Sequence, residues 1–138
     1  ANEMGPRHGD ELNLIVAGSN YGWPLVSEGN HYSGALIPPH ETRPDFASPV
    51  AYWVPTLAPS GLTFLIGNEF KNWEGHALLG GLKGKSLVRL KLRDQKVIEE
   101  ERFSWRVRVR DVEVQNNGFI WVIEDGSNAR LIKFSSPD

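Results

Sequence analysis

The sequence contains no cysteine among its 138 residues. The lack of thiols excludes disulfide scaffolds, thiolate zinc sites and cysteine nucleophiles. Long hydrophobic runs are also missing, and none approaches the roughly 18 apolar residues that a membrane-spanning helix requires. Neither sign of charge is in large excess, because 15 Lys+Arg against 17 Asp+Glu give a formal net charge of −2. We therefore expect no membrane span, and no nucleic-acid partner, since a broad basic face for phosphates is absent.

The composition is that of an ordinary globular domain, with 40% hydrophobic and 23% charged residues. A chain of this length can bury roughly two-thirds of its surface on folding. The first ten residues lack the charged-then-apolar order of a signal peptide.

Frequent glycine and proline separate short apolar runs, and this pattern predicts an all-β fold. Several runs alternate, as where Leu62, Phe64 and Ile66 share one side of a strand. The few candidate helical turns, around Glu69–Trp73, are too short to change the fold class. The strand-sized runs are Leu12–Val16, Leu62–Ile66, Ala77–Leu82, Leu87–Leu92, Val112–Val114, Phe119–Ile123 and Leu131–Phe134.

A weak internal repeat refines this prediction. Ala77–Leu92 aligns with Phe119–Phe134 without gaps at an offset of 42 residues, with Gly84 and Gly126 in register within the turns. A period of roughly 40–45 residues with three or four strands suits a β-propeller blade. A simple antiparallel sandwich with two similar hairpins is the alternative.

The length then limits the number of blades. At this period the chain supplies about three blades at most, whereas a closed propeller needs about four to eight. We expect one β-propeller region with blade-like units at about 1–54 (incomplete), 60–103 and 108–135. Such a chain is either part of a larger propeller or a short protein that completes its sheets by self-association as an oligomer.

Three loops could carry chemistry. Gly5-Pro6, followed by Asp10 and Glu11, offers carbonyl and carboxylate oxygens of the kind that Ca²⁺ prefers, although an ordinary loop with a solvated acidic pair has the same pattern. Asn20–Pro24 predicts a buried turn plug whose Trp23 indole N–H finds a backbone partner, with a stacking wall for a ligand as the alternative. The hydroxyls of Thr56 and Ser60 could contact a ligand or cap local turns.

The cationic residues form a fourth candidate. Lys83 follows an apolar run, and Arg106, Arg108 and Arg110 alternate, which in a strand points all three guanidinium groups to one side. Pairing with the Glu99–Glu101 run could neutralise one of them. For all three together with Lys83, a small polyanionic ligand is the better explanation, because Arg presents a bidentate fork to carboxylates.

The histidines give no metal motif. His8, His31, His40 and His76 have no HxxxH or HxH spacing, and we expect surface or structural roles for them.

Several motifs together resemble the soluble PQQ-dependent sugar dehydrogenases, the glucose/sorbosone dehydrogenase family that includes the aldose sugar dehydrogenases. The likeness covers nearly the whole chain in the right order, and the long first motif is the most specific part. The matching segments are Gly5–Asn13, Gly18–Pro24, Pro55–Gly61, Gly81–Gly84, Arg108–Val112 and Leu131–Phe134.

The resemblance implies the C-terminal part of a six-bladed β-propeller that belongs to a periplasmic or secreted protein. It implies PQQ and Ca²⁺ as cofactors, a sugar as substrate, and oxidation of the C1 hydroxyl to a lactone. Met4, Gly5 and Pro6 match the loop whose backbone oxygens help to hold the Ca²⁺. Arg106 has no counterpart in the family. The positions that match cofactor-contacting residues are Asp10, Thr56, Lys83, Arg108 and Arg110.

The resemblance also implies what this chain lacks. The family's histidine base stands in an earlier blade, and none of the four histidines here falls in a matching motif. We therefore expect no turnover from this chain alone. The alternative is a non-catalytic binding or self-assembling module built from part of a propeller.

Overall fold

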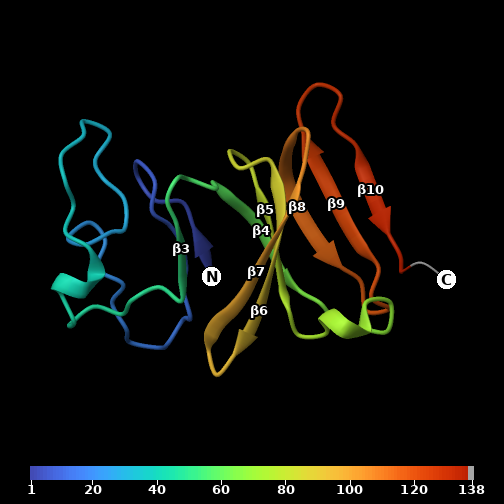
Figure 1. The fold of residues 1–138 in the computed structure, drawn as a ribbon, viewed down its shortest axis with the longest axis horizontal. Coiled ribbons are helices and arrows are strands. Elements are labelled where there is room, and N and C mark those ends of the chain that lie inside the picture. Colours follow the sequence, from blue (N-terminus) through green and yellow to red (C-terminus); the bar gives the residue numbers. More distant parts are fainter. Residues whose placement is uncertain (137–138) are drawn as a thin grey trace. The chain divides into compact units, whose positions relative to one another are not determined.

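The computed structural model describes residues 1–136 and contains ten β-strands, two single 3₁₀ turns and no α-helix within that range (Figure 1). The all-β prediction is confirmed. The strands form three antiparallel sheets. The first contains β1 (Asn2–Glu3), β2 (Asp10–Leu12) and β3 (Ala51–Trp53), and the second contains β4 (Pro59–Phe64), β5 (Ala77–Gly81), β6 (Ser86–Arg93) and β7 (Lys96–Ser104). The third contains β8 (Arg108–Val114), β9 (Ile120–Asp125) and β10 (Leu131–Phe134). The 3₁₀ turns are η1 (His40–Thr42) and η2 (Lys71–Trp73).

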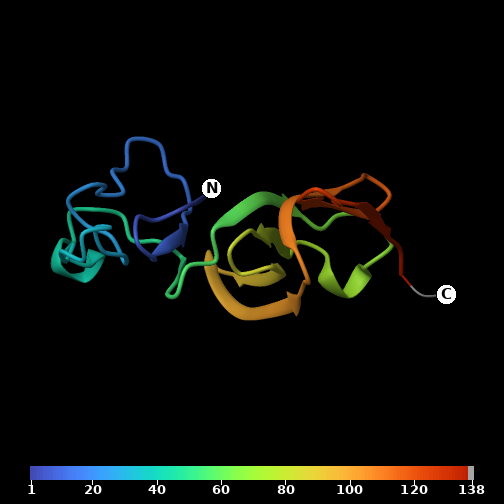
Figure 2. The same ribbon diagram turned by 90° about the horizontal axis from the view of Figure 1, so that it is seen from above.

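The chain divides into two compact units, Ala1–Ala58 and Pro59–Asp138. In the second unit, β4 and β5 pack against β8, and Figure 2 shows β4 and β8 lying beside each other. The contact is close at Gly80, where a side chain would place a Cβ 2.7 Å from Val109 Cγ1. The Ser60 hydroxyl also donates a 2.6 Å hydrogen bond to the Val109 carbonyl oxygen. The buried core between these sheets consists of Leu65, Leu78, Leu87, Val109, Val112, Val114, Ile120 and Val122.

The repeat reappears in the second unit as two hairpins, β5–β6 and β9–β10, each preceded by a strand that pairs with its first member. One strand of this unit has no equivalent in the sequence prediction. β7 pairs with β6 along nearly its whole length, but it lies at the sheet edge and is mostly solvent-exposed. Because its residues are largely charged, it gives no apolar signal.

Two other expectations need correction. The strand predicted at Leu12–Val16 ends at Leu12, because neither β1 nor β3 pairs with residues beyond it. The backbone there bonds to Tyr21 instead: the Tyr21 hydroxyl donates to the Leu14 carbonyl oxygen and accepts from the Val16 N–H. In β4, the side that carries Phe64 is exposed, whereas Leu65 just beyond the strand is buried. A bulge between Ser60 and Leu62 displaces the register there.

The first unit has little regular structure beyond β1–β3. Its buried apolar side chains are Leu12, Val26, Ile37, Trp53 and Leu57. Long loops therefore depend on polar contacts for their placement.

Candidate functional site

Asp10 on β2 is the main anchor of the loops in the first unit. Its side chain is 1% exposed. Oδ1 accepts from the Gly5 N–H at 2.9 Å, and Oδ2 accepts from the Thr56 hydroxyl at 2.6 Å and from the Leu57 and Ala58 N–H groups at 2.7 Å each. Four donors stabilise the charged carboxylate in a buried position. Asp10 thus ties the loop at Gly5 to the loop at Thr56, and any part it takes in ligand binding acts through those loops.

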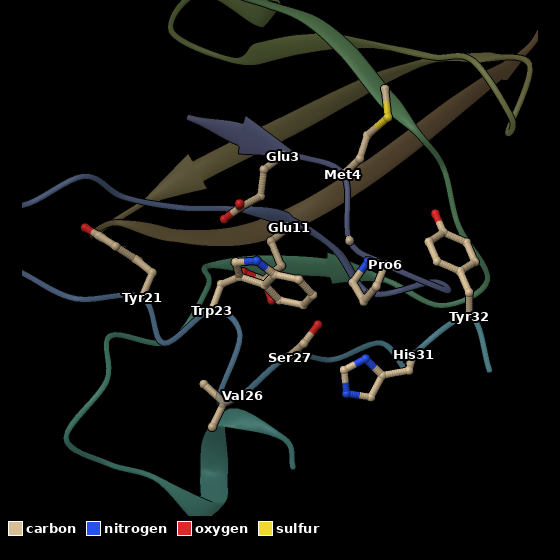
Figure 3. Close-up of a pocket in the computed structure, with 12 residues that line it drawn as sticks. Glu3, Met4, Pro6, Glu11, Tyr21, Trp23, Val26, Ser27, His31 and Tyr32 are labelled. Atoms are coloured by element: carbon tan, nitrogen blue, oxygen red, sulfur yellow. The ribbon is translucent and has the colours of Figure 1, made fainter. Parts of the chain in front are cut away.

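The loop at Met4–Pro6 lines a pocket of about 430 Å³ in the first unit (Figure 3). No N–H or O–H of the described residues donates to the carbonyl oxygens of Met4, Gly5 or Pro6. Among the described residues, no group of three or more histidine, aspartate or glutamate side chains is placed to hold a metal ion. A cation at this loop would therefore depend on backbone oxygens.

Trp23 also lines this pocket, and the prediction of a buried plug is wrong. Its side chain is 59% exposed. The space under the turn is filled by other residues, since a Cβ on Gly22 would meet Val26 Cγ2 at 2.2 Å and the Phe46 ring at 3.0 Å. Because the Trp23 ring is exposed at the pocket, the structure favours the alternative prediction, in which this turn provides a stacking wall for a ligand.

A buried polar network lies behind this pocket, and sequence reasoning missed it because its members are far apart in the chain. His40 is 3% exposed, and its Nε2 lies 3.0 Å from the Tyr21 carbonyl oxygen. Its Nδ1 lies 3.1 Å from Glu28 Oε1 and 3.9 Å from Glu11 Oε1. A carbonyl oxygen can only accept, so Nε2 carries a proton here. His40 thereby fixes the loop that carries one pocket wall.

Glu11 connects this network to the pocket that it lines. Burial raises the pKa of Glu11, while the Asn13 amide and His40 act in the opposite direction. The Asn13 amide donates to Glu11 Oε2 at 3.2 Å and to Glu3 Oε1 at 2.7 Å.

The cationic candidates lie in the second unit. Arg108 Nε is 2.7 Å and an Arg110 terminal nitrogen 2.9 Å from the same oxygen, Oδ2 of Asp125 on β9. Both arginine side chains remain about half exposed. A bulge between Val109 and Asp111 leaves Arg110 without a cross-strand partner. The shared face predicted for the arginines thus holds for these two.

The prediction does not hold for Arg106, which lies in a bend before β8 begins. The suggested partners of the arginines are also different. Glu99 and Glu101 both pair with Arg89, a buried residue of β6, because β7 lies directly beside that strand. Lys83 lies in the exposed turn between β5 and β6, and no carboxylate of the described residues pairs with it.

The hydroxyls of the loop at Thr56 have internal partners. Thr56 donates to Asp10 and Ser60 to the Val109 carbonyl oxygen, so both act as turn or strand braces in this structure. The oxygen of Thr56 keeps free lone pairs and could still accept a hydrogen bond.

The histidines have the structural roles expected of them, with one addition. His8 Nδ1 accepts from the Thr56 N–H at 3.2 Å, and His76 Nδ1 lies 2.7 Å from Arg89. His31, by contrast, lines the same pocket as Trp23. Within the described residues, no helix is long and apolar enough to cross a membrane.

Comparison with known proteins gives consistent matches. The family model for glucose/sorbosone dehydrogenase matches residues 1–133. The chain is 37% identical over 140 residues to aldose sugar dehydrogenase YliI of Escherichia coli K12, covering 97% of this chain and 37% of that protein. It is 41% identical to an uncharacterised protein of Synechocystis sp., covering 99% of this chain and 34% of that protein. The chain thus spans about a third of the length of these relatives.

Solved structures agree. A crystal structure of a glucose dehydrogenase superposes with a TM-score of 0.89 at 37% identity, covering 99% of this chain and 40% of that one. The PQQ-bound aldose sugar dehydrogenase of Streptomyces coelicolor gives a TM-score of 0.69 at 27% identity, covering 96% of this chain and 38% of that one. The three sheets of this chain are accordingly part of a β-propeller, as the repeat and the resemblance predicted.

Proposed function

Because this chain belongs to the glucose/sorbosone dehydrogenase family, we propose that it is the C-terminal part of a PQQ- and Ca²⁺-dependent aldose sugar dehydrogenase, which oxidises the C1 hydroxyl of sugars to lactones. Its contribution is to present cations to the cofactor. One observation carries this proposal: two half-exposed arginines, Arg108 and Arg110, share the single carboxylate of Asp125.

The donor set fits an anionic ligand. Two guanidinium groups around the one carboxylate of Asp125 leave this ion cluster with a net positive charge, which favours an anion beside it. Lys83 adds a cation without a carboxylate partner among the described residues. PQQ carries three carboxylates, so we assign Lys83, Arg108 and Arg110 to hold them, and Thr56 and the Asp10-anchored loop to the remaining contacts.

The Met4–Pro6 loop is assigned to Ca²⁺, and the support is its backbone. Ca²⁺ takes six to eight oxygen ligands, and the three carbonyl oxygens of this loop accept no hydrogen bond from the described residues. The absence of a carboxylate cluster means that further ligands would have to come from elsewhere. When bound, PQQ accepts the two electrons removed from the sugar and Ca²⁺ polarises its carbonyl.

We further propose that this chain alone does not turn over sugar. Of its histidines, His40 and His76 are buried in polar networks and His8 accepts from the Thr56 backbone. These three are committed to structure, and none matches the family's base. A periplasmic or secreted location belongs to the same proposal, by analogy with the family.

We propose that the three sheets correspond to blades, the first of them incomplete, at about 1–54, 60–103 and 108–135.

A second candidate function is a non-catalytic, self-assembling module. The observation that favours it is the outer face of the β8–β10 sheet, where Ile123 and Leu131 are opposite each other and exposed. Light scattering tests it, since a stable dimer or trimer would support self-association and a monomer would exclude it.

The main proposal is tested by titrating the purified chain with PQQ in the presence of Ca²⁺. The Arg108→Ala/Arg110→Ala variant should lose binding, because two of the three carboxylate partners are removed. The Arg93→Ala/Arg106→Ala variant removes the same charge from two exposed arginines elsewhere and should bind as the wild type does. Equal loss in both variants, or none in either, would refute the assigned cofactor face. Dye-linked glucose oxidation by the PQQ- and Ca²⁺-loaded chain would refute the predicted lack of turnover.

A further inference from the structure

The alternation of side chains along β8 is interrupted once. Val112 and Val114 are both buried in the core of the second unit. Side chains of a regular strand alternate between its two faces, so the same alternation continued back along β8 would carry Arg110 and Arg108 to the core side as well. The structure instead buries Val109 and leaves both arginine side chains about half exposed.

A β-bulge causes this change. The pairing of β8 with β9 shifts between Val109 and Asp111, and Arg110 is the extra residue, without a cross-strand partner of its own. One inserted residue moves the side chains before it to the opposite face of the strand, and the inserted residue itself leaves the alternation. The bulge therefore keeps the arginine pair out of the core, where both guanidinium groups reach Asp125.

The neighbouring strand β4 contacts the residue on each side of Arg110. β4 and β8 lie beside each other (Figure 2). On one side, the Ser60 hydroxyl donates a 2.6 Å hydrogen bond to the Val109 carbonyl oxygen. On the other side, Asp111 lies against Gly61 so closely that a Cβ on this glycine would overlap Asp111 Oδ1. Both residues that flank Arg110 are thus held by β4.

The backbone of β4 is shaped for this contact. Gly61 has a φ of +38°, in the left-handed region that favours glycine, and β4 has its own bulge between Ser60 and Leu62. The Oδ1 atom of Asp111 that lies against Gly61 also accepts the Val112 N–H at 2.9 Å. The bulges of the two strands therefore meet each other, and each depends on the side chains or the missing side chain of the other.

We propose that β4 positions Arg110 through this bulge, and that the positioning residues are Ser60, Gly61 and Asp111. The bulge places the guanidinium of Arg110 beside that of Arg108. Arg108 needs no such support, because it remains in the ladder with β9. Arg110 lacks a ladder partner, so its backbone depends on β4. The consequence for cofactor binding rests on the proposed function, in which both arginines hold carboxylates of PQQ.

Paired variants of Asp111 test the bulge contact without PQQ. Asp111→Ala removes the acceptor of the Val112 N–H, whereas Asp111→Asn removes the same charge and keeps an oxygen in that place. In crystal structures, Asp111→Asn should keep the 2.9 Å pair between Arg110 and Asp125, and Asp111→Ala should separate it beyond about 4 Å. A pair that is intact in both variants, or lost in both, would overturn the proposal.

The second measurement is the affinity for PQQ in the presence of Ca²⁺. Arg110→Ala should weaken binding about tenfold or more, since a charge-assisted hydrogen bond is lost, and Ser60→Ala about three- to tenfold. In the Arg110→Ala background, Ser60→Ala should change the affinity less than about twofold, because its effect passes through Arg110. Equal losses in the two backgrounds would show that Ser60 has only a structural role, and would overturn the proposal.

Gly118→Ala is the matched control for general strain. Gly118 has a φ of +98° in the turn after β8, and a Cβ there would lie 2.8 Å from the Glu69 backbone nitrogen. The variant should lower the stability in urea unfolding and bind PQQ as the wild type does. A loss of affinity equal to that of Ser60→Ala would refute a specific role for Ser60.

The outcomes separate this proposal from the proposed function. If the wild type does not bind PQQ, the proposed function fails, and the crystal structures of the Asp111 variants still decide whether Arg110 depends on β4. If the wild type binds PQQ through Arg108 and Arg110, but Ser60→Ala and Asp111→Ala bind equally well, the cofactor face stands and the positioning role is refuted. Circular dichroism checks that each variant is folded.

Discussion

Replacing Asp10 by asparagine should unfold the first unit more readily than any change on its surface. Asparagine has the same shape but only one oxygen. If that oxygen takes the Oδ2 position, where three donors converge, the amide nitrogen faces the Gly5 N–H, and two donors meet without an acceptor. Leaving such a buried pair unsatisfied costs roughly 1–3 kcal/mol. The three remaining hydrogen bonds lose their ionic character, at a further cost of about 1 kcal/mol each in a favourable case.

We therefore expect Asp10→Asn to lower the free energy of unfolding by about 3–5 kcal/mol, a large share of the roughly 5–15 kcal/mol that stabilises a typical domain. Urea unfolding, followed by circular dichroism and tryptophan fluorescence, measures it. Trp53 is a suitable reporter because it is buried and pairs with Asp10 across β2 and β3.

Two further variants bracket the result. Thr56→Ala removes one of the four donors and should cost about 1–2 kcal/mol. Asp45→Asn alters an exposed ion pair with Arg43 and should change the stability by less than about 0.5 kcal/mol. If Asp10→Asn costs no more stability than Thr56→Ala, the Asp10 carboxylate is not the main anchor of these loops.

Three other predictions concern the second unit. Burial and the neighbouring Arg89 lower the pKa of His76, so the unfolded chain binds more protons at this residue than the folded chain does. The free energy of unfolding should therefore fall as the pH drops below the ordinary histidine pKa near 6.5. His76→Gln should flatten this part of a plot of urea midpoint against pH, and an unchanged slope would contradict the assignment. Hydrogen bonding from Arg130 lowers the pKa of Glu124 to about 2. The ionised Glu124 therefore stabilises the fold above the pKa that this residue has in the unfolded chain, and this stabilisation is lost as the pH falls toward 2. In Arg130→Gln, an NMR titration of the carboxyl groups should find a higher midpoint for Glu124, and an unchanged midpoint would refute Arg130 as the cause. Gly80→Ala would place its methyl group 2.7 Å from both Ser60 Oγ and Val109 Cγ1. Urea unfolding should find the free energy of unfolding lower by about 1–3 kcal/mol. A variant as stable as the wild type would show that the two sheets can separate locally.

The strands of the second unit were predictable where an apolar face meets a neighbouring sheet. β5, β6 and β9 have such faces, and each lies within one or two residues of its predicted range. β10 matches its predicted range as well, although three of its four residues are exposed. β7 was not predictable, because an exposed edge strand is held by backbone hydrogen bonds to β6 and needs no apolar residues. The run at Leu12–Val16 had the composition of a strand but lacks partners beyond Leu12.

The candidate site divides in the same way. The spacing of Arg108 and Arg110 placed them on one face, while the carboxylate between them, Asp125, comes from a strand 15 residues later. Trp23 was expected inside, and only packing of Val26 and Phe46 beneath the turn shows why it stays outside.

The sequence by itself determined that this chain forms β-sheets from short repeated hairpins and that it belongs with the quinone-dependent sugar dehydrogenases, because alternation and loop motifs are local features. Tertiary structure alone decided which polar side chains meet, since Asp10 finds its donors 46 to 48 residues away at Thr56, Leu57 and Ala58. It also decided that His40 braces Glu28 and Tyr21 behind an acidic, aromatic pocket. A buried hydrogen bond depends on the positions of both partners in space, and the spacing of residues along a chain does not specify those positions.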